Sequence, residues 1–272
     1  MTGERNAALL EWYRTDRRDL PWRNTRDPYR ILVSEVMLQQ TQVARVIPRY
    51  LQFLERFPTV EDLAAAPLRD VLAEWHGLGY NGRGRRLWEA ARAVTVGGWP
   101  ADAASLRSLP GVGPYTAAAV ASLAFDERVP AVDTNLRRVI GRWVGRPLSG
   151  RALRDAAVGL VPAESAAWNQ AVMDLGATLC RPEGPRCGEC PVAAWCADPT
   201  VPSAPSRQPP FRGSLRQVRG AIVRHLAEAP EATVVEIAAA TGHPEDRVRE
   251  AAEALAGDGL ITAAGTAYRL GE

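Results

Sequence analysis

Residues 109–120 read LPGVGPYTAAAV, and this stretch carries the clearest fold signal in the chain. Gly111 and Gly113 can adopt positive φ angles, and Pro114 suits the first position of a helix because its missing N–H needs no partner there. The pattern therefore predicts two helices joined by a glycine hairpin. The N–H groups of such a hairpin can bind a phosphate, and an ordinary turn between two core helices is the alternative.

Composition and charge limit the class of protein. With 272 residues and 46% hydrophobic content, the chain has room for one large domain and one small domain. No apolar run approaches the ~18 residues of a membrane span, and residues 1–5 do not resemble a signal peptide, so we expect a cytoplasmic monomer without membrane contact. Residues 214–272 hold six Arg against nine acidic residues, a net charge of −3, whereas the whole chain carries +2. The positive charge of residues 1–213 favours a polyanionic partner.

Residues 29–42 are typical of a helix on which one carboxyl group is flanked by apolar side chains. Glu35 shares a face with Ile31 and Leu38, so burial would keep it neutral and able to donate a proton. A partly exposed helical Glu is the alternative. The polar run at residues 39–42 favours a surface that faces a ligand.

Residues 77–80 read GLGY and predict a tight loop with Leu78 and Tyr80 at its tip. An exposed aliphatic side chain beside an exposed ring can insert into a base stack, whereas a loop folded back on the core would bury both. The arginines of residues 81–86 either contact phosphates or stay solvated. Helical periodicity continues beyond the loop, and no strand signal precedes Val129, so the large domain is predicted to be all-α.

Asp133 lies in residues 132–135, VDTN, just before a helix predicted to begin near Leu136. A helix N-terminus favours the charged carboxylate, so we expect a lowered pKa for Asp133, with a simple helix cap as the plain alternative. If Glu35 and Asp133 face one cavity, one is an acid and the other an anion. Such a pair suits glycosidic bond cleavage, because the acid protonates the leaving group and the anion stabilises the sugar cation or bonds to it.

The chain contains four cysteines, with the spacing C-x6-C-x2-C-x5-C. Disulfides are disfavoured in a cytoplasmic chain, so the cluster predicts a metal site. A tetrahedral zinc ion and a [4Fe–4S] cluster both suit four thiolates at this spacing. The residues are Cys180, Cys187, Cys190 and Cys196.

Seven segments occur in a characteristic order. They are PWR at 21–23, SEVMLQQTQ at 34–42, GLGY at 77–80, LPGVG at 109–113, VD at 132–133, NQAVMDLG at 169–176 and the cysteine quartet. Over about residues 8–197 the chain thereby resembles the adenine DNA glycosylases of the MutY type. These proteins belong to the helix-hairpin-helix superfamily, which also contains endonuclease III. The resemblance implies a [4Fe–4S] cluster and removal, by base flipping, of adenine mispaired with 8-oxoguanine or guanine in double-stranded DNA.

The resemblance also implies roles for single residues. Glu35 resembles the acid that protonates adenine N7, and Asp133 resembles the carboxylate that stabilises the sugar cation. Arg23 and Gln170 fall where the family lines the adenine pocket. Contacts with the opposite base and with DNA are expected for Gln40, Thr41, Gln42, Leu78, Tyr80, Gly111, Gly113 and Tyr115.

Tyr115 and Thr134 mark two departures from relatives. Tyr115 stands where bifunctional relatives carry a Schiff-base lysine, and the chain contains no lysine. Lysine-dependent strand cleavage is therefore excluded, which leaves the terminal amine of Met1 as a remote candidate. The same tyrosine occurs in relatives that remove thymine from G·T mispairs. A mismatch thymine or uracil glycosylase thus stays an alternative, as does a DNA-binding regulator without catalysis. Thr134 replaces a glycine found in many members.

Full-length members of the family end in a domain that is related to nucleotide-pyrophosphate hydrolases and helps to read 8-oxoguanine. The C-terminal residues of this chain are too few for such a domain, so they depart from the family as well. After a catalytic domain at 1–197 and a Pro-rich linker at 198–213, residues 214–272 predict a winged-helix-like α/β domain of three helices and a two-stranded wing. Its third helix, at 244–256, is acidic and would repel phosphates. We therefore expect this domain to contact a protein or the catalytic domain, with DNA reading as the alternative.

Overall fold

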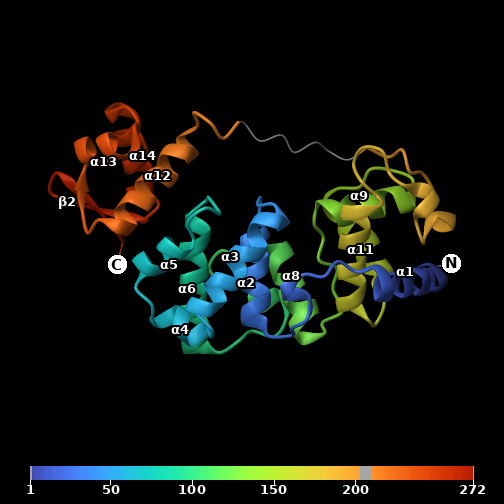
Figure 1. The fold of residues 1–272 in the computed structure, drawn as a ribbon. Coiled ribbons are helices and arrows are strands. Elements are labelled where there is room, and N and C mark those ends of the chain that lie inside the picture. Colours follow the sequence, from blue (N-terminus) through green and yellow to red (C-terminus); the bar gives the residue numbers. More distant parts are fainter. Residues whose placement is uncertain (1, 203–209, 272) are drawn as a thin grey trace. The chain divides into compact units, whose positions relative to one another are not determined.

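The computed structural model describes residues 2–202 and 210–271 and is predominantly helical, as predicted (Figure 1). Within these residues, no helix combines the length and the apolar character that crossing a bilayer requires. Contacts divide the chain into two compact units that combine distant segments. The first unit contains residues 1–32, 99–108 and 112–206, and the second contains residues 33–98, 109–111 and 207–272.

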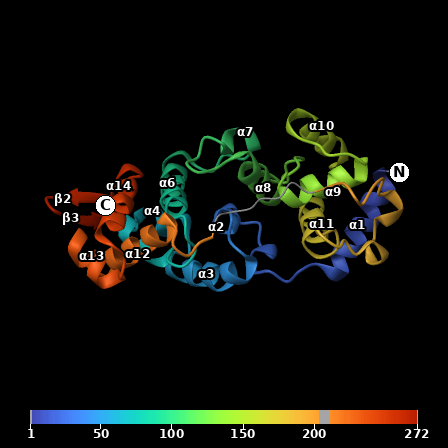
Figure 2. The same ribbon diagram turned by 90° about the horizontal axis from the view of Figure 1, so that it is seen from above.

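The first unit is built around α11 (Ser165–Thr178), which lies beside α1 (Thr2–Asp16) and α9 (Thr134–Val144) in both views (Figures 1 and 2). Trp168 of α11 is fully buried and donates a hydrogen bond to Asn6 of α1 at 3.0 Å. A polar pair inside the core thus aligns two helices. The other elements are α7 (Ala103–Leu106), α8 (Pro114–Phe125), α10 (Gly150–Leu160) and the 3₁₀ turns Pro21–Arg23, Cys187–Glu189 and Ala193–Trp195.

The glycine hairpin precedes α8. Gly111 has a φ of +75°, and a Cβ there would lie 2.7 Å from the Cβ of Arg86, so no side chain fits. The prediction of a positive φ for Gly113 was wrong, because Gly113 has a φ of −83° as the N-cap of α8. Pro114 occupies the first turn of α8 as predicted, and Tyr115 follows it half-buried.

The helix α2 (Pro28–Leu38) runs from the first unit into the second and ends earlier than predicted. Gln40 has a φ of +58°, and residues 39–41 form a turn and bend instead of a continued helix. The carbonyl groups of Val36 and Met37 accept hydrogen bonds from Arg83 at 2.8 and 3.0 Å. A distant side chain therefore satisfies carbonyl groups that the end of a helix leaves open.

In the second unit, Thr59 and Asp62 form a capping box that starts a separate short helix. Phe53 and Trp75 pack edge to face in the core, with ring centroids 6.0 Å apart. The helices are α3 (Val43–Arg56), α4 (Val60–Ala65), α5 (Leu68–Glu74) and α6 (Gly82–Gly97).

The C-terminal residues of the second unit form the predicted winged-helix-like arrangement, with the helices and the wing gathered together in Figure 2. The antiparallel sheet has the order β1-β3-β2, and Ile261 pairs with Leu270. The sequence predicted two strands and missed β1, which at two residues is too short to show periodicity. The elements are α12 (Leu215–Glu228), β1 (Ala232–Thr233), α13 (Val234–Thr241), α14 (Glu245–Gly257), β2 (Ile261–Ala264) and β3 (Ala267–Leu270).

Candidate active site and metal centre

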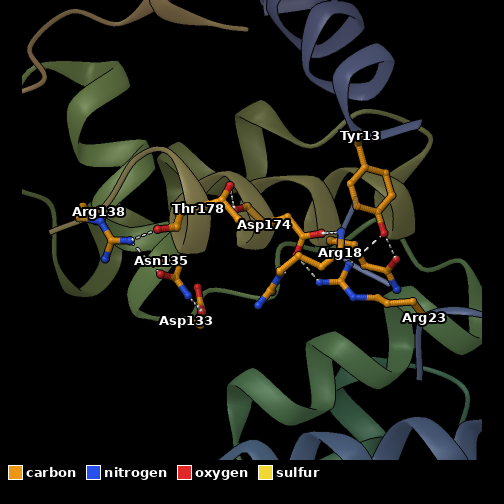
Figure 3. Close-up of polar contacts among 10 residues, drawn as sticks. Tyr13, Arg18, Arg23, Asp133, Asn135, Arg138, Asp174 and Thr178 are labelled. Carbon is orange, nitrogen blue, oxygen red and sulfur yellow. Dashed lines mark hydrogen bonds and ion pairs between the residues drawn. The ribbon is translucent and has the colours of Figure 1, made fainter. Parts of the chain in front are cut away.

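Asp133 is the N-cap of α9 in the first unit (Figure 3). Its Oδ1 accepts the N–H of Leu136 at 2.7 Å, and its Oδ2 accepts the side-chain amide of Asn135 at 2.9 Å. Burial nevertheless raises the pKa of Asp133, and these hydrogen bonds offset that effect only in part. The prediction of a lowered pKa was wrong, because it counted the helix N-terminus but not the loss of water around the carboxylate.

Two residues that the sequence did not single out connect Asp133 with the cysteine loop. Asn135 accepts a hydrogen bond from Arg138 at 2.8 Å, and Arg138 donates to the carbonyl groups of Gly176 and Cys180, each at 2.7 Å. A Cβ on Gly176 would lie only 2.6 Å from the Cβ of Asn135, so α9 and α11 approach closely here. The glycine that ends the NQAVMDLG motif was the available sequence signal. The cysteine loop and Asp133 thus share one hydrogen-bonded support.

Arg23 and Gln170, predicted to line one pocket, are connected through Tyr13. Figure 3 shows Tyr13 and Arg23 beside each other. Arg23 donates to the Tyr13 hydroxyl at 2.9 Å, and that hydroxyl donates to Oε1 of Gln170 at 2.5 Å. Arg23 also pairs with Asp174 at 2.7 Å, and Asp174, 1% exposed, accepts two further bonds from Arg18. Burial raises the pKa of Tyr13, so its phenol keeps its proton. Sequence reasoning missed Tyr13 and Asp174, although the latter lies in a quoted motif.

Glu35 lies on the part of α2 that belongs to the second unit and is 5% exposed. This burial rules out the alternative of a partly exposed helical Glu. The role of Glu35 as a proton donor stays a prediction. Because Glu35 and Asp133 belong to different units, a shared cavity stays a prediction.

Arg83 of α6 organises the polar turn and the GLGY loop of the second unit. It is 8% exposed, so the prediction of solvated or phosphate-binding arginines at 81–86 was wrong for this residue. Burial lowers the pKa of Arg83 to about 10, which leaves it charged at neutral pH. Its position between two glycines gave no sign of this role. Besides the helix α2 carbonyls, its acceptors are the carbonyls of Gln39, Leu78 and Gly79 and the hydroxyl of Thr41, at 2.5, 3.1, 3.1 and 3.1 Å.

Leu78 and Tyr80 differ in exposure. Leu78 is 3% exposed, so the prediction of an exposed aliphatic tip was wrong for it, because the loop folds this side chain onto the core. Tyr80 stays 38% exposed and has a φ of +48°, which a bulky residue adopts only under strain. Gln40 and Gln42 are exposed nearby in sequence, whereas Thr41 is half-buried and donates to the Leu78 carbonyl at 3.4 Å. The structure thus brings the turn and the loop together.

The four cysteines line a single cavity of about 90 Å³ and form no disulfides. Arg142 of α9 donates to the Cys180 sulfur at 3.2 Å and to the Arg181 carbonyl at 2.8 Å. Burial raises the pKa of Cys196 to about 11, so a bound cation is needed to deprotonate it. Among the described residues, no three His, Cys, Asp or Glu side chains converge on the position of one metal ion. Four free thiols lining one cavity are a ligand set that either an iron–sulfur cluster or a zinc ion can use, so the identity of the metal stays a prediction.

Comparisons with known proteins extend these observations. Residues 33–150 match the family model described as "HhH-GPD superfamily base excision DNA repair protein". The adenine DNA glycosylase of Mycobacterium tuberculosis is 42% identical over 96% of this chain and 92% of its own length. The mouse adenine DNA glycosylase is 47% identical over 70% of this chain and 41% of its own length.

Two solved structures share the fold. A thermostable thymine-DNA glycosylase has a TM-score of 0.67 and 36% identity, and the match covers 72% of this chain and 95% of that protein. A trapped endonuclease III–DNA covalent intermediate has a TM-score of 0.61 and 25% identity, with coverages of 73% and 97%. The motifs, the helical fold and the similarity along almost the whole chain lead to one assignment: this protein belongs to the adenine DNA glycosylase family, within the helix-hairpin-helix superfamily of base excision repair proteins.

Proposed function

We propose that this protein is a monofunctional DNA glycosylase that removes adenine mispaired with 8-oxoguanine or guanine. The observation that carries the proposal is the presence of two carboxyl groups at the family's positions, the buried Glu35 and the half-buried Asp133. A DNA-binding regulator has no use for such a pair. The 42% identity to an adenine DNA glycosylase over 96% of the chain supports adenine as the base.

In the proposed reaction, Glu35 donates a proton to N7 of the flipped adenine. The bond between N9 and the sugar C1′ then breaks, and its electron pair passes to the base. Asp133 stabilises the positive charge that develops on the sugar, and its burial makes this stabilisation larger than it would be in water. Water adds to C1′ and returns a proton to Glu35, which leaves free adenine and an abasic site.

Recognition of the two bases is assigned to two groups of residues. We propose that Arg23 and Gln170 line the adenine pocket, where Tyr13 fixes Oε1 of Gln170 and so orients its amide donor. For the base opposite the adenine, we propose that the exposed Tyr80 wedges beside the 8-oxoguanine, together with the turn that contains Gln40. Such contacts offset the few kcal/mol that base flipping costs.

We also propose a [4Fe–4S] cluster on Cys180, Cys187, Cys190 and Cys196. When bound, the cluster supplies a cross-link that orders the loop, and Arg142 supports that loop from α9. Iron analysis of the purified protein is expected to give about four iron atoms per chain, and Cys190→Ser is expected to lose most of them. Stoichiometric zinc in place of iron would reject the cluster.

The absence of lysine supports a glycosylase without lysine-dependent strand cleavage. Tyr115 stands at the position of the Schiff-base lysine in bifunctional relatives. Borohydride treatment of the protein on cleaved DNA is therefore expected to trap no covalent complex, and efficient trapping would contradict this part of the proposal.

The decisive experiment is single-turnover base release from three duplexes, with A opposite 8-oxoguanine, A opposite G and T opposite G. Fast adenine release that disappears in Glu35→Gln is the expected result. Thymine release is the second candidate, favoured by 36% identity to a thymine-DNA glycosylase structure. Tight binding to all three duplexes without release of any base would reject the enzyme and favour a DNA-binding regulator.

A further inference from the structure

All three histidines of the chain line one groove of about 690 Å³. The groove lies within the second unit, between the loop at residues 76–81 and the helices α12 and α13. This volume lies within the range of ligand-binding clefts. The histidines are His76 from the loop and His225 and His243 from the C-terminal segment.

The charged side chains of the groove are mostly cations. Arg45 comes from α3, Arg216 and Arg224 come from α12, and Glu228 is the acidic residue of its described lining. Burial, Arg224 and Arg49 lower the pKa of His76, which keeps this imidazole neutral near pH 7. Neutral imidazoles and arginines are hydrogen-bonding partners of phosphate oxygens. A histidine metal site is not indicated, since nowhere in residues 2–202 and 210–271 do three His, Cys, Asp or Glu side chains meet at one metal position.

Arg216 connects the two walls of the groove, α12 and the GLGY loop. Its Nη1 donates to the Tyr80 hydroxyl at 2.6 Å, and its guanidinium carbon lies 5.6 Å from the centroid of the Tyr80 ring. The groove's cations from the C-terminal segment thus reside on α12. The acidic helix α14 holds the position of the DNA-reading helix in a winged helix, but the sequence predicted that it would repel phosphates, and it contributes no residue to the groove.

We propose that this groove binds the phosphates of a DNA strand that passes Tyr80, with Arg45, Arg216 and Arg224 as the cations that face them. The proposal rests on the proposed function for its ligand, because that function makes duplex DNA the substrate. It adds a direct role in DNA binding for the C-terminal segment. An acidic protein segment is the competing occupant, but the adjacent strained and exposed Tyr80 favours DNA, since aromatic rings stack on bases.

The test compares charge reversal inside and outside the groove in the full chain. Arg224→Glu removes an exposed cation of the groove, and Arg249→Glu removes an exposed cation of α14 outside it. Affinity for an undamaged duplex is measured by fluorescence anisotropy at several salt concentrations. Arg224→Glu is expected to weaken binding about tenfold and to reduce the salt slope by about 1 or more, whereas Arg249→Glu leaves both within about twofold.

Equal effects of the two variants on DNA affinity would reject the proposal that the groove binds DNA phosphates. Circular dichroism checks that both variants are folded, and Arg224→Gln repeats the test without a new negative charge. Adenine release is measured separately on the unaltered protein. If Arg224→Glu loses DNA binding and the unaltered protein releases no adenine, the proposed glycosylase function is rejected, whereas DNA binding by the groove is retained. If the unaltered protein releases adenine and both variants bind DNA equally, DNA binding by the groove is rejected, whereas the proposed glycosylase function is retained.

Discussion

Arg83 donates a hydrogen bond to the backbone carbonyl of Gln39 at 2.5 Å, although the two residues are 44 positions apart. The same guanidinium holds the carbonyl groups of Leu78 and Gly79, so one buried arginine connects the end of α2 with the GLGY loop. Its charge is balanced by carbonyl dipoles, and Tyr80 and Trp75 lie within 5.5 and 5.6 Å of it. The loop is therefore preorganised before any ligand arrives.

Replacing Arg83 with Met is expected to lower the free energy of unfolding by about 3 kcal/mol, because several buried carbonyl groups lose their donor. The variant should also lose most of its preference for 8-oxoguanine over guanine opposite adenine. Urea unfolding and base release from the two duplexes measure these effects. The control is Arg86→Met, an exposed arginine of the same helix. An unchanged urea midpoint in Arg83→Met would contradict the organising role.

Asn135→Ala is expected to change the pH dependence of base release. In the proposed reaction Asp133 must be ionised to stabilise the sugar cation, so the rate is expected to fall as the pH drops through the pKa of Asp133. Burial already raises that pKa, and the hydrogen bond from Asn135 lowers it in part. Loss of the bond should raise the pKa further, so the fall in rate should begin at higher pH. Single-turnover rates across the acid range test this, and coincident profiles for the two proteins would exclude it.

Asp174→Asn is expected to lower the free energy of unfolding by about 3–5 kcal/mol, since it leaves the nearly buried Arg23 without its carboxylate. Base release should slow as well, because Arg23 loses its fixed orientation beside Tyr13. Denaturant unfolding and single-turnover rates give the two measurements. Asp155→Asn is the matched control, as the exposed pair of Asp155 with Arg151 is expected to contribute at most about 0.5 kcal/mol. Equal losses of stability in the two variants would show that the contacts of Asp174 with Arg23 do not stabilise the fold in the expected way.

Arg142→Gln is expected to release iron about tenfold faster in the presence of a chelator. The reason is that Arg142 donates both to the Cys180 sulfur and to the cysteine-loop backbone, and such supporting contacts tune metal affinity. Visible absorbance and released iron follow the reaction. Arg146→Gln, at an exposed position just after the same helix, serves as the control. Identical release from both variants would mean that Arg142 does not protect the cluster.

Local patterns were sufficient for much of this protein. Helical periodicity, Pro114 at a helix start, Gly111 in a hairpin and the spacing of the cysteines each depend on neighbours in sequence, so the helical class and the family could be read directly. The wing strands β2 and β3 also followed from local signals. These features needed no knowledge of distant contacts.

Other features depend on residues brought together from far along the chain. α2 ends at Leu38 because Arg83, 46 positions from Met37, satisfies its last carbonyl groups. The side chain of Leu78 is buried for the same kind of reason, since its loop is held onto the core. The pKa of Asp133 rises because folding removes water, an effect that no local motif reports. Burial and long-range hydrogen bonding are properties of the assembled core, and they set the chemistry of residues whose identity the sequence had already revealed.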